Sequence, residues 1–232
     1  MKIAVMQPYF FPYVGYFQLI AAVDKFVVFD DVNYINRGWI NRNNILVGGK
    51  SVLVTLPLKE VSQNKKIYEI DTTSDAKLID KLVKTVMMNY KKAPFFEPVF
   101  TLIQQIFSNK SGSIAELNTI QLKSICAYLN IGSHLVTSSR FYNNDHLKGQ
   151  DRIMDICNQE NADIYINPIG GTELYKRENF EQKGIQLFFI KSQMIEYRQF
   201  NHPFVPWLSI IDVLMFNSVE QTREILKQYQ LV

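Results

Sequence analysis

The chain has 232 residues and a net charge of +3, with 47% hydrophobic and 20% charged residues. This composition excludes an intrinsically disordered protein, and the length is that of one large domain over residues 1–232, or of two closely packed lobes. Because the lysines and arginines are scattered, the charge lacks the basic footprint of a nucleic-acid binder, and we expect no nucleic-acid partner.

The sequence also predicts a cytoplasmic protein. The apolar N-terminal stretch is interrupted by Gln7, Pro8 and Pro12, which makes it a poor signal peptide. No apolar run approaches the roughly 20 residues that a membrane-spanning helix requires. Cys126 and Cys157 each stand alone in apolar helical sequence, so we expect two buried thiols in a reducing compartment rather than a disulfide.

Short strands and helices alternate at the start of the chain. Residues 3–6 form an apolar run that ends in Gln-Pro, residues 14–23 have near-helical spacing, and residues 25–29 have the pattern of a second strand. Strand, helix and strand in this order imply two parallel strands joined by a right-handed crossover. We expect a third strand over residues 51–58 and a fourth over residues 67–70.

The middle of the chain predicts helices. Apolar side chains in residues 76–90 recur at the i, i+3, i+4 spacing of an amphipathic helix, and residues 96–107 repeat the pattern. Ser113 and the glutamate three residues later form a capping box for a helix that runs to about Leu129. We therefore expect a helical insertion over about residues 76–130.

The alternation of strands and helices returns in the last hundred residues. We expect strands over residues 134–137, 163–167 and 185–190, and helices over residues 150–159, 173–182 and 208–216, with a last helix capped by Ser218 and Gln221. The sequence thus predicts an α/β fold with a mainly parallel sheet and flanking helices.

Three polar segments fall at the carboxyl ends of predicted strands, where parallel α/β sheets bind their ligands. The first lies between the first strand and helix and contains Gln7, Tyr9, Tyr13, Gly15 and Tyr16. Gly15 would allow close approach of a ligand to the free N–H groups of the first helical turn, and the tyrosines would add hydroxyl donors. The alternative is a packed aromatic turn.

The second segment, residues 30–44, concentrates acids, arginines and asparagines. Asp30 or Asp31 would serve as a general base or hold a divalent ion, and Arg37 and Arg42 offer forks for phosphate or carboxylate. Amide and hydroxyl groups suited to sugar hydroxyls come from Asn33, Tyr34 and Asn41. The alternative is a solvated loop in which these acids pair with these arginines.

The third segment follows the strand predicted over residues 163–167 and combines Asn167 with Gly170 and Gly171. Two glycines before a threonine N-cap suit a phosphate-cradling turn, although tight strand-to-helix turns use the same residues. Ser138 and Ser139 end another predicted strand and would reach the same rim.

The histidines do not suggest a metal centre. His134, His146 and His202 are far apart and lack ligand spacing, so we expect them to be structural and predict no metal site.

The layout Tyr13-Val14-Gly15-Tyr16, between a strand and a helix, resembles the His-x-Gly-His loop of nucleotidyltransferases and their ATP-using ligase relatives. Tyrosine replaces both histidines, so the charge-stabilising role of imidazole is lost.

Longer stretches resemble the WbqC-like protein family. They are QPYFFPYVGYFQLI, DDVNYINRGWINRNNIL, NYKKAPFF, TSSRF, DIYINPIGGTELY and FVPWLSIIDVLMFN, and they follow the family's order over nearly the whole chain. The resemblance implies a bacterial protein associated with gene clusters for O-antigen or other surface polysaccharides. Its ligand would be a nucleotide-linked, often amino-bearing sugar, or an acyl or aminoacyl donor that decorates one. The resemblance supplies no catalytic residues.

The resemblance, together with the loop rich in acids, arginines and amides, implies a transferase of lipopolysaccharide biosynthesis that N-acylates or aminoacylates an amino sugar nucleotide. Asp30, Asp31 and Tyr16 are the catalytic candidates, with an aspartate accepting the proton of the amine, and Arg37 and Arg42 would bind phosphate. The donor stays open between acyl-CoA, a carrier-linked acyl group and ATP. The alternatives are an ATP-dependent adenylating amide ligase, and a non-catalytic sugar-binding or assembly subunit beside polysaccharide-biosynthesis enzymes.

Overall fold

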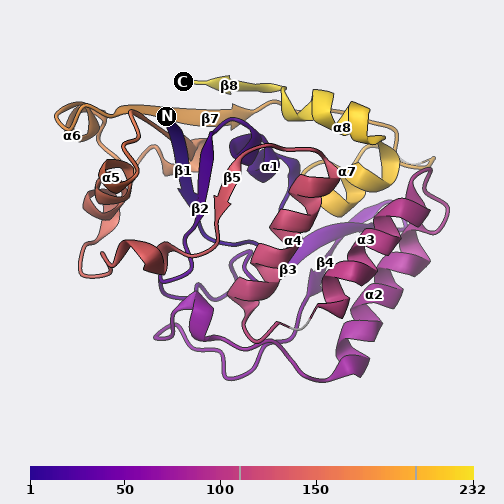
Figure 1. The fold of residues 1–232 in the computed structure, drawn as a ribbon. Helices are drawn as coiled ribbons and strands as arrows, with labels where there is room; N and C mark the ends of the chain where they lie inside the picture. Colours follow the sequence, from indigo (N-terminus) through magenta and orange to yellow (C-terminus); the bar gives the residue numbers. More distant parts are fainter. Residues whose placement is uncertain (110, 202) are drawn as a thin grey trace.

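A six-stranded sheet with the strand order β5-β2-β1-β6-β7-β8 lies at the centre of the structure, a computed structural model that describes residues 1–109, 111–201 and 203–232 (Figure 1). The parallel strands are β1 (Lys2–Met6), β2 (Lys25–Val28), β5 (His134–Val136), β6 (Ile164–Pro168) and β7 (Gln186–Ser192). The last strand, β8 (Tyr229–Leu231), pairs antiparallel with β7. The predicted α/β fold with a mainly parallel sheet is confirmed.

The sheet is wound in two directions from β1. The chain first adds β2 and β5 on one side of β1, then crosses to the other side and adds β6 and β7. In order of appearance the parallel strands thus follow the doubly wound order 3-2-1-4-5. The winding reverses between β1 and β6, and in such folds the ligand crevice lies outside the carboxyl ends of the strands at this switch point.

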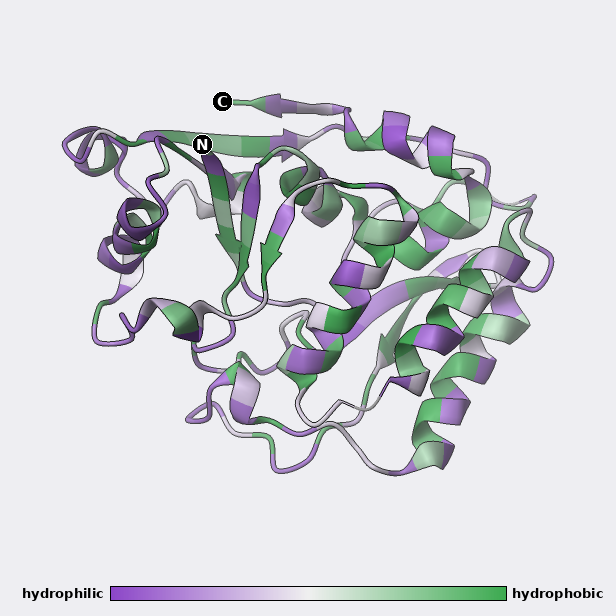
Figure 2. Ribbon diagram, viewed as in Figure 1, coloured by the Kyte–Doolittle hydropathy of each residue, from purple (hydrophilic) through white to green (hydrophobic). Residues whose placement is uncertain are grey.

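Side chains alternate along each strand and so point to both faces of the sheet, and helices cover both faces. Ile3 and Val5 of β1 pack with α5 (Gly149–Gln159) and α6 (Arg177–Glu181), whereas Ala4 faces a larger cluster. That cluster includes side chains of α1 (Val14–Ala21), α4 (Ile114–Tyr128), α7 (Ile210–Phe216) and α8 (Val219–Leu226). β1 and β2 are accordingly hydrophobic along most of their length (Figure 2).

The helices in the middle of the chain form from their own sequence signals. α2 (Ala76–Tyr90) has the predicted bounds, and its N-cap Asp75 accepts a hydrogen bond of 2.9 Å from Lys77 N–H. α3 is Phe96–Ser108, and Ser113 caps α4 through the N–H of Glu116 at 3.2 Å. The helices predicted over residues 76–90, 96–107 and 113–129 are therefore confirmed.

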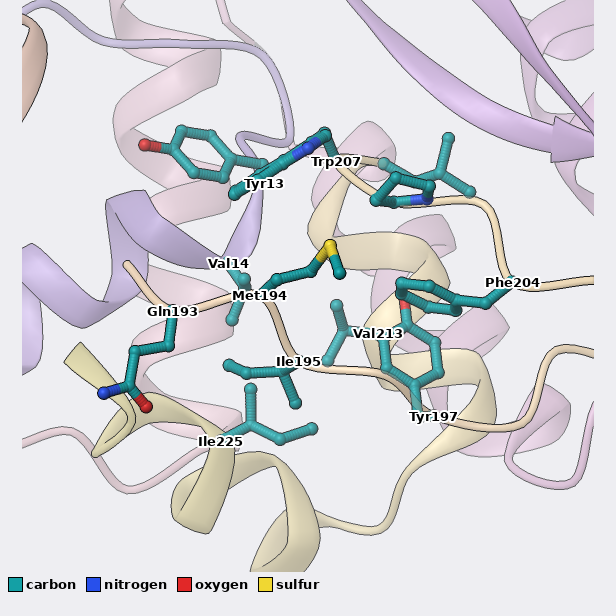
Figure 3. A pocket seen from close by; sticks show the side chains of 12 residues that line it. Tyr13, Val14, Gln193, Met194, Ile195, Tyr197, Phe204, Trp207, Val213 and Ile225 are labelled. Atoms are coloured by element: carbon teal, nitrogen blue, oxygen red, sulfur yellow. The ribbon is translucent and has the colours of Figure 1, made fainter. Parts of the chain in front are cut away.

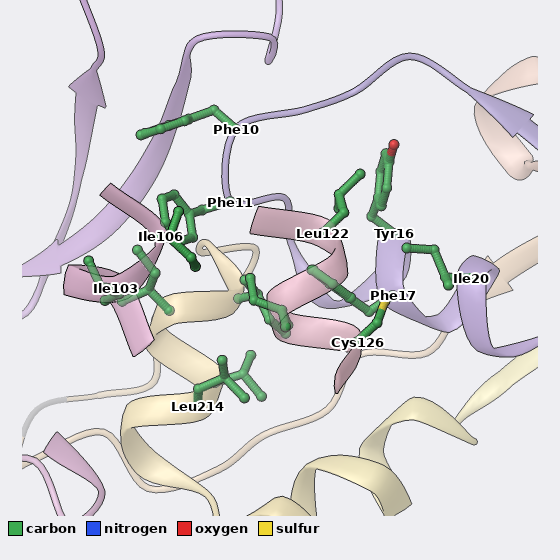
Figure 4. Close-up of a cluster of buried hydrophobic side chains, with 14 of the residues drawn as sticks. Phe10, Phe11, Tyr16, Phe17, Ile20, Ile103, Ile106, Leu122, Cys126 and Leu214 are labelled. Carbon is green, nitrogen blue, oxygen red and sulfur yellow. The ribbon is translucent and has the colours of Figure 1, made fainter. Parts of the chain in front are cut away.

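Part of the aromatic N-terminal segment lies in the core. Phe10 and Phe11 are buried, and their rings lie 6.4 and 6.1 Å from that of Phe107 in α3. Figure 4 shows both rings beside Ile103 and Ile106 of α3. This packing fixes the loop between β1 and α1 against the helices of the insertion.

The predicted third strand belongs to a separate hairpin rather than to the central sheet. β4 (Lys50–Thr55) pairs antiparallel with β3 (Arg42–Val47), which the sequence patterns did not reveal. Gly48 and Gly49 join these strands with φ of 57° and 75°, the left-handed geometry that two-residue hairpin turns require. The hydrophobic run of β4 could not indicate which partner it takes.

Three further elements differ from prediction. The fourth strand predicted over residues 67–70 is wrong: Ile67–Glu69 is a 3-10 helix whose Glu69 carboxylate accepts the N–H of Lys66 at 2.6 Å. The helix predicted over residues 173–182 shortens to α6. The short strand β8 was not predicted, since three residues show no resolvable alternation.

Substitution of Gly15 tests how tightly α1 packs against its neighbours. A Cβ at this position would lie 2.4 Å from both Ser192 Oγ and the ring of Tyr13, so Gly15→Ala forces both side chains to move. We expect a loss of about 1–3 kcal/mol in the free energy of unfolding, measured by urea denaturation. Gly170→Ala, where a Cβ would meet nothing within 4 Å, is the control and should change stability by less than about 0.5 kcal/mol. Equal losses in both variants would contradict this packing.

Candidate functional site

A cleft of about 450 Å³ opens at the switch point of the sheet. Its walls come from the loop after β1, the end of β2 and the end of β6, and they include Gln7, Tyr9, Phe29, Asn167, Gly170 and Gly171. This volume lies within the roughly 300–1,000 Å³ of small-molecule sites. The structure thus brings together the first and third polar segments, which are distant in the sequence.

The third segment is built around the Asn167 side chain. Its Oδ1 accepts a hydrogen bond of 3.1 Å from Tyr165 Oη, and its Nδ2 donates to the carbonyl of Pro168 at 3.3 Å. A Cβ on Gly171 would lie 1.8 Å from this Nδ2, so the glycine leaves room for the amide. Gly170 is exposed at the cleft, in the short 3-10 helix Ile169–Gly171. Close packing against Asn167 therefore accounts for Gly171.

The second segment meets the end of β5 at Asp30. One carboxylate oxygen, Oδ1, accepts hydrogen bonds from Ser138 Oγ at 2.8 Å and from Ser139 N–H at 3.1 Å. The other, Oδ2, lies 3.9 Å from Nε of Arg140. Asp30 is only 3% exposed. Both predicted serines thus hold the carboxylate in one orientation.

The electrostatics of this carboxylate suit proton transfer. Burial raises the pKa of Asp30, the hydrogen bonds from Ser138 and Ser139 and the charge of Arg140 oppose that rise, and the neighbouring Asp31 adds to it. An oriented carboxylate with a raised pKa is a better proton acceptor than a solvated one, and such groups cluster at functional sites. Asp30 directly follows Phe29, which lines the cleft.

Asp31 has a different environment. Its Oδ2 forms a buried ion pair with Arg152 of α5, and its Oδ1 accepts the hydroxyl of Ser139. Arg152 also donates from Nε to Asn144 Oδ1 at 2.9 Å, and its guanidinium lies 4.8 Å over the ring of Phe29. The alternative in which the two aspartates pair with Arg37 and Arg42 is therefore wrong.

Arg152 was absent from the predicted site, although the sequence carries a signal for it. It stands four residues before Ile156 in the helix predicted over residues 150–159 and therefore falls on the same face of that helix, which is buried. An arginine on a buried helical face needs a buried partner, but its position in the sequence does not identify that partner.

The Arg42 side chain makes hydrogen bonds to backbone carbonyls of its own loop. Arg42 Nε donates to the carbonyl of Gly38 at 2.9 Å, and a second guanidinium nitrogen donates to the carbonyl of Arg37. Arg37 itself is exposed and has a φ of 61°. Of these two predicted phosphate ligands, Arg37 is exposed and Arg42 is half-buried.

The predicted sugar-binding groups also make internal contacts. Tyr34 Oη donates to Asn41 Oδ1 at 2.8 Å, and Asn41 Nδ2 donates to the carbonyl of Leu56 at 2.9 Å. Asn33 Oδ1 accepts from Lys66 Nζ at 3.0 Å. These bonds connect residues 33–41 to the segment after β4.

The first segment divides into a buried part and an accessible part. Tyr16 is buried, its hydroxyl donates to the carbonyl of Gln7 at 2.8 Å, and Gly15 is buried beside it. Tyr9 and Tyr13 are only half-buried. Gln7 and Tyr9 line the cleft, whereas Tyr13 lies edge-to-face against Trp207 with ring centroids 6.2 Å apart.

The remaining reactive side chains lie outside this arrangement. Cys126 and Cys157 are free and buried, as expected, and burial raises the pKa of each thiol to about 12. Over the residues that the structure describes, no three His, Cys, Asp or Glu side chains gather as a metal site would require. His202 lies outside the described residues.

Fold and site together define a doubly wound α/β protein with a candidate ligand cleft at its switch point. The chain belongs to the WbqC-like protein family, whose model matches residues 7–224. It is also similar to the uncharacterized protein Rv1507c of Mycobacterium tuberculosis, with 30% identity over 93% of both chains. No solved structure matches it. Among the described helices, none is long and apolar enough to cross a bilayer.

Breaking the buried ion pair should be costly. Arg152→Met leaves the charge of Asp31 buried without its partner, and we expect a loss of about 3–5 kcal/mol in the free energy of unfolding. Lys227→Met breaks an exposed pair with Glu224 and should cost no more than about 1 kcal/mol. Adding Asp31→Asn to Arg152→Met should recover part of the loss. Additive losses in the double variant would show that the two residues are not coupled.

The pH dependence of stability tests the environment of Asp30. Since the folded state raises the pKa of Asp30 above its ordinary 3.8, the free energy of unfolding falls as the pH rises from that value through the folded pKa. Asp30→Asn removes this loss. We therefore expect the stability of the variant relative to the wild type to be greater at about pH 7 than at about pH 4. A constant or opposite difference in urea denaturation would contradict the raised pKa.

Proposed function

We propose that the chain is a transferase that acylates or aminoacylates the amino group of a nucleotide-linked sugar in bacterial surface-polysaccharide biosynthesis. The observation that carries this proposal is the buried Asp30 carboxylate, oriented by two serines at the sheet edge that also forms the cleft. Family membership supports it, since the name of the family is linked to polysaccharide biosynthesis.

The reaction needs one proton acceptor and no redox change. The sugar amine attacks the carbonyl carbon of the donor, a C–N bond forms, the bond from that carbon to the donor's leaving group breaks, and Asp30 takes the proton that the nitrogen releases. The proton then passes to the leaving group. In this proposal the donor is an acyl or aminoacyl group activated as a thioester or as an adenylate.

We assign the role of base to Asp30 rather than to Asp31. Both oxygens of Asp31 are engaged, one by Arg152 and one by Ser139, whereas Oδ2 of Asp30 makes no hydrogen bond to a described residue. Asp31 and Arg152 therefore act as positioning residues, which hold Ser139 and through it Asp30. Tyr16, with its hydroxyl bonded to a backbone carbonyl, takes a structural role in this proposal.

Two exposed arginines would bind the diphosphate of the nucleotide-linked sugar. The side chain of Arg140 is 55% exposed, and its guanidinium lies 4.4 Å over the ring of Tyr68 and within reach of the Asp30 carboxylate. Arg37 is exposed on the loop that also contributes Ile35 to the cleft. Nε of Arg140 donates to Ser138 Oγ at 3.0 Å, so the two terminal nitrogens of the guanidinium are the donors that would bind phosphate.

A second candidate function is an adenylating amide ligase. The doubly wound strand order favours it, because folds of this order bind nucleotides at the switch point. The Tyr13-Val14-Gly15-Tyr16 layout also follows β1, the first strand of that order. In such a ligase ATP would activate the carboxylate of the donor before the amine attacks.

A thermal-shift screen tests these alternatives. Amino sugar nucleotides, acyl-CoAs, amino acids and ATP with magnesium are added to the full chain, and a ligand at a hundred times its Kd should stabilise by about 2.7 kcal/mol. Stabilisation by amino sugar nucleotides, followed by transfer of an acyl or aminoacyl group to the sugar amine, supports the transferase. Release of AMP and pyrophosphate in the presence of a sugar and an acid supports the ligase, and stabilisation with neither reaction leaves a binding subunit.

Once a donor and acceptor are paired, Asp30→Asn separates chemistry from binding. We expect kcat to fall by roughly 10²–10⁴-fold, with little change in the Kd of the nucleotide sugar, because the amide keeps an oxygen for the serines but accepts no proton. Asp80→Asn, an exposed change on α2, is the control. Full activity of the Asp30→Asn variant would remove Asp30 as the base.

A further inference from the structure

Both tryptophans of the chain line one slot beside the switch-point cleft. The slot has a volume of about 210 Å³ and is lined by Tyr9, Pro12, Tyr13, Trp39, Asn43 and Trp207. Trp39 and Trp207 are the chain's two tryptophans, and they are 43% and 55% exposed. Two large aromatic side chains that converge on one opening without being buried indicate a contact surface for a ligand.

The walls of the slot are held in place by the backbone. Phe10 N–H donates to the carbonyl of Trp39 at 2.9 Å, and Ile210 N–H donates to that of Pro12 at 2.9 Å. Ser209 adds a bond of 2.8 Å from its Oγ to the carbonyl of Phe11. These bonds fix the two tryptophan-bearing segments to the turn between β1 and α1.

The segment that carries Trp207 is also anchored on α7. Asp212 accepts hydrogen bonds from Tyr197 Oη and Gln199 Nε2, both at 2.6 Å, and Gln199 Oε1 accepts the N–H of Val205 at 2.7 Å. Trp207 itself has a φ of 61°, which is unfavourable for a bulky side chain. A strained residue that presents an exposed ring is typical of a functional position.

The chemistry of the walls selects an uncharged planar ring. The six lining residues include no charged side chain, so a phosphate or a metal ion finds no partner there. The Asn43 amide is already used: Nδ2 donates to the carbonyls of Phe10 and Phe11, and Oδ1 accepts the N–H of Asn44. Sugar hydroxyls would therefore lose water without gaining the amide as a partner.

The geometry of the rings also suits a flat aromatic group. Tyr13 and Trp207 stand at 68° with centroids 6.2 Å apart, so a ring stacked on one of them meets the other edge-on, the two arrangements that aromatic pairs prefer. Figure 3 shows the two side chains next to each other, beside Met194. All three line a second pocket, of about 30 Å³. That pocket holds only a water or two, since each needs about 10–15 Å³. The room for a ring is in the slot.

Tyr9 lines both the slot and the switch-point cleft, so the two are neighbours. We propose that the aromatic slot binds the nucleobase of the nucleotide-linked sugar, while the sugar occupies the cleft that is lined by Phe29, the residue before Asp30. This inference rests on the proposed function, because it places the nucleotide part of that substrate. Since the slot offers stacking surfaces and its one amide is engaged, it should hold a purine and a pyrimidine with similar affinity.

Tryptophan fluorescence and calorimetry test this assignment in the full chain. Uridine diphosphate and adenosine diphosphate are the probes with a base, and N-acetylglucosamine 1-phosphate is the probe without one. Both diphosphates should quench the fluorescence, since all of it comes from the slot. Trp207→Ala and Trp39→Ala should each raise the Kd of both diphosphates by roughly 5- to 150-fold.

Matched variants keep the result interpretable. Trp207→Phe and Trp39→Phe retain an aromatic face and should restore most of the affinity, and Met88→Ala, an exposed change on α2, should have no effect. The Kd of N-acetylglucosamine 1-phosphate should be the same in all variants. Because neither tryptophan is part of the buried core, the melting temperatures of the variants should stay close to that of the wild type.

Three results would overturn the assignment. Unchanged binding of the diphosphates in both alanine variants would place the base elsewhere and leave the proposed transferase intact. Equal weakening of N-acetylglucosamine 1-phosphate would show that the slot holds the sugar. Binding of that phosphate alone, with no binding of either diphosphate, would contradict both the slot and the nucleotide-linked substrate.

Discussion

The sheet reverses its winding at β1, and this reversal determines which polar loops meet. β1 is paired on both sides with parallel strands, and Ile3 and Ala4 at its centre are completely buried, so the strand tolerates neither a polar side chain nor a shift in register. The chain leaves β1 toward α1 on one face of the sheet and leaves β6 toward α6 on the other, so the loops after these two strands separate and open the cleft. The same reversal brings Gln7 and Asn167 to one wall.

A series of buried polar contacts orients the Asp30 carboxylate at the carboxyl end of β2. Arg152 pairs with Asp31, Asp31 accepts the Ser139 hydroxyl, and Ser139 holds Asp30 through its backbone N–H. Burying an ion pair gains little net stability compared with apolar packing, so its value here is in the fixed relation of α5, β2 and the residues that follow β5. A carboxylate fixed in this way needs no reorganisation when it accepts a proton.

The fold was accessible from the sequence where the signal was local. The period of the apolar residues and the cap at Asp75 or Ser113 determine α2 and α4, and Gln7, Asp30 and Asn167 were correctly placed at strand ends. The pairing of strands could not be predicted from the sequence, because the residues of β4 are equally compatible with the central sheet and with a hairpin. Partners distant in sequence were missed for the same reason: neither Arg152 nor Trp207 indicates by itself what it faces.

Hydrogen–deuterium exchange with a bound nucleotide-linked amino sugar tests the central claim, that the ligand lies at the switch point. A ligand in the cleft should protect backbone amides in residues 7–16, 29–41, 138–140 and 167–172 together, because these segments lie at the carboxyl ends of neighbouring parallel strands. Unchanged exchange there, with protection confined to α2, α3 or α8, would contradict the account.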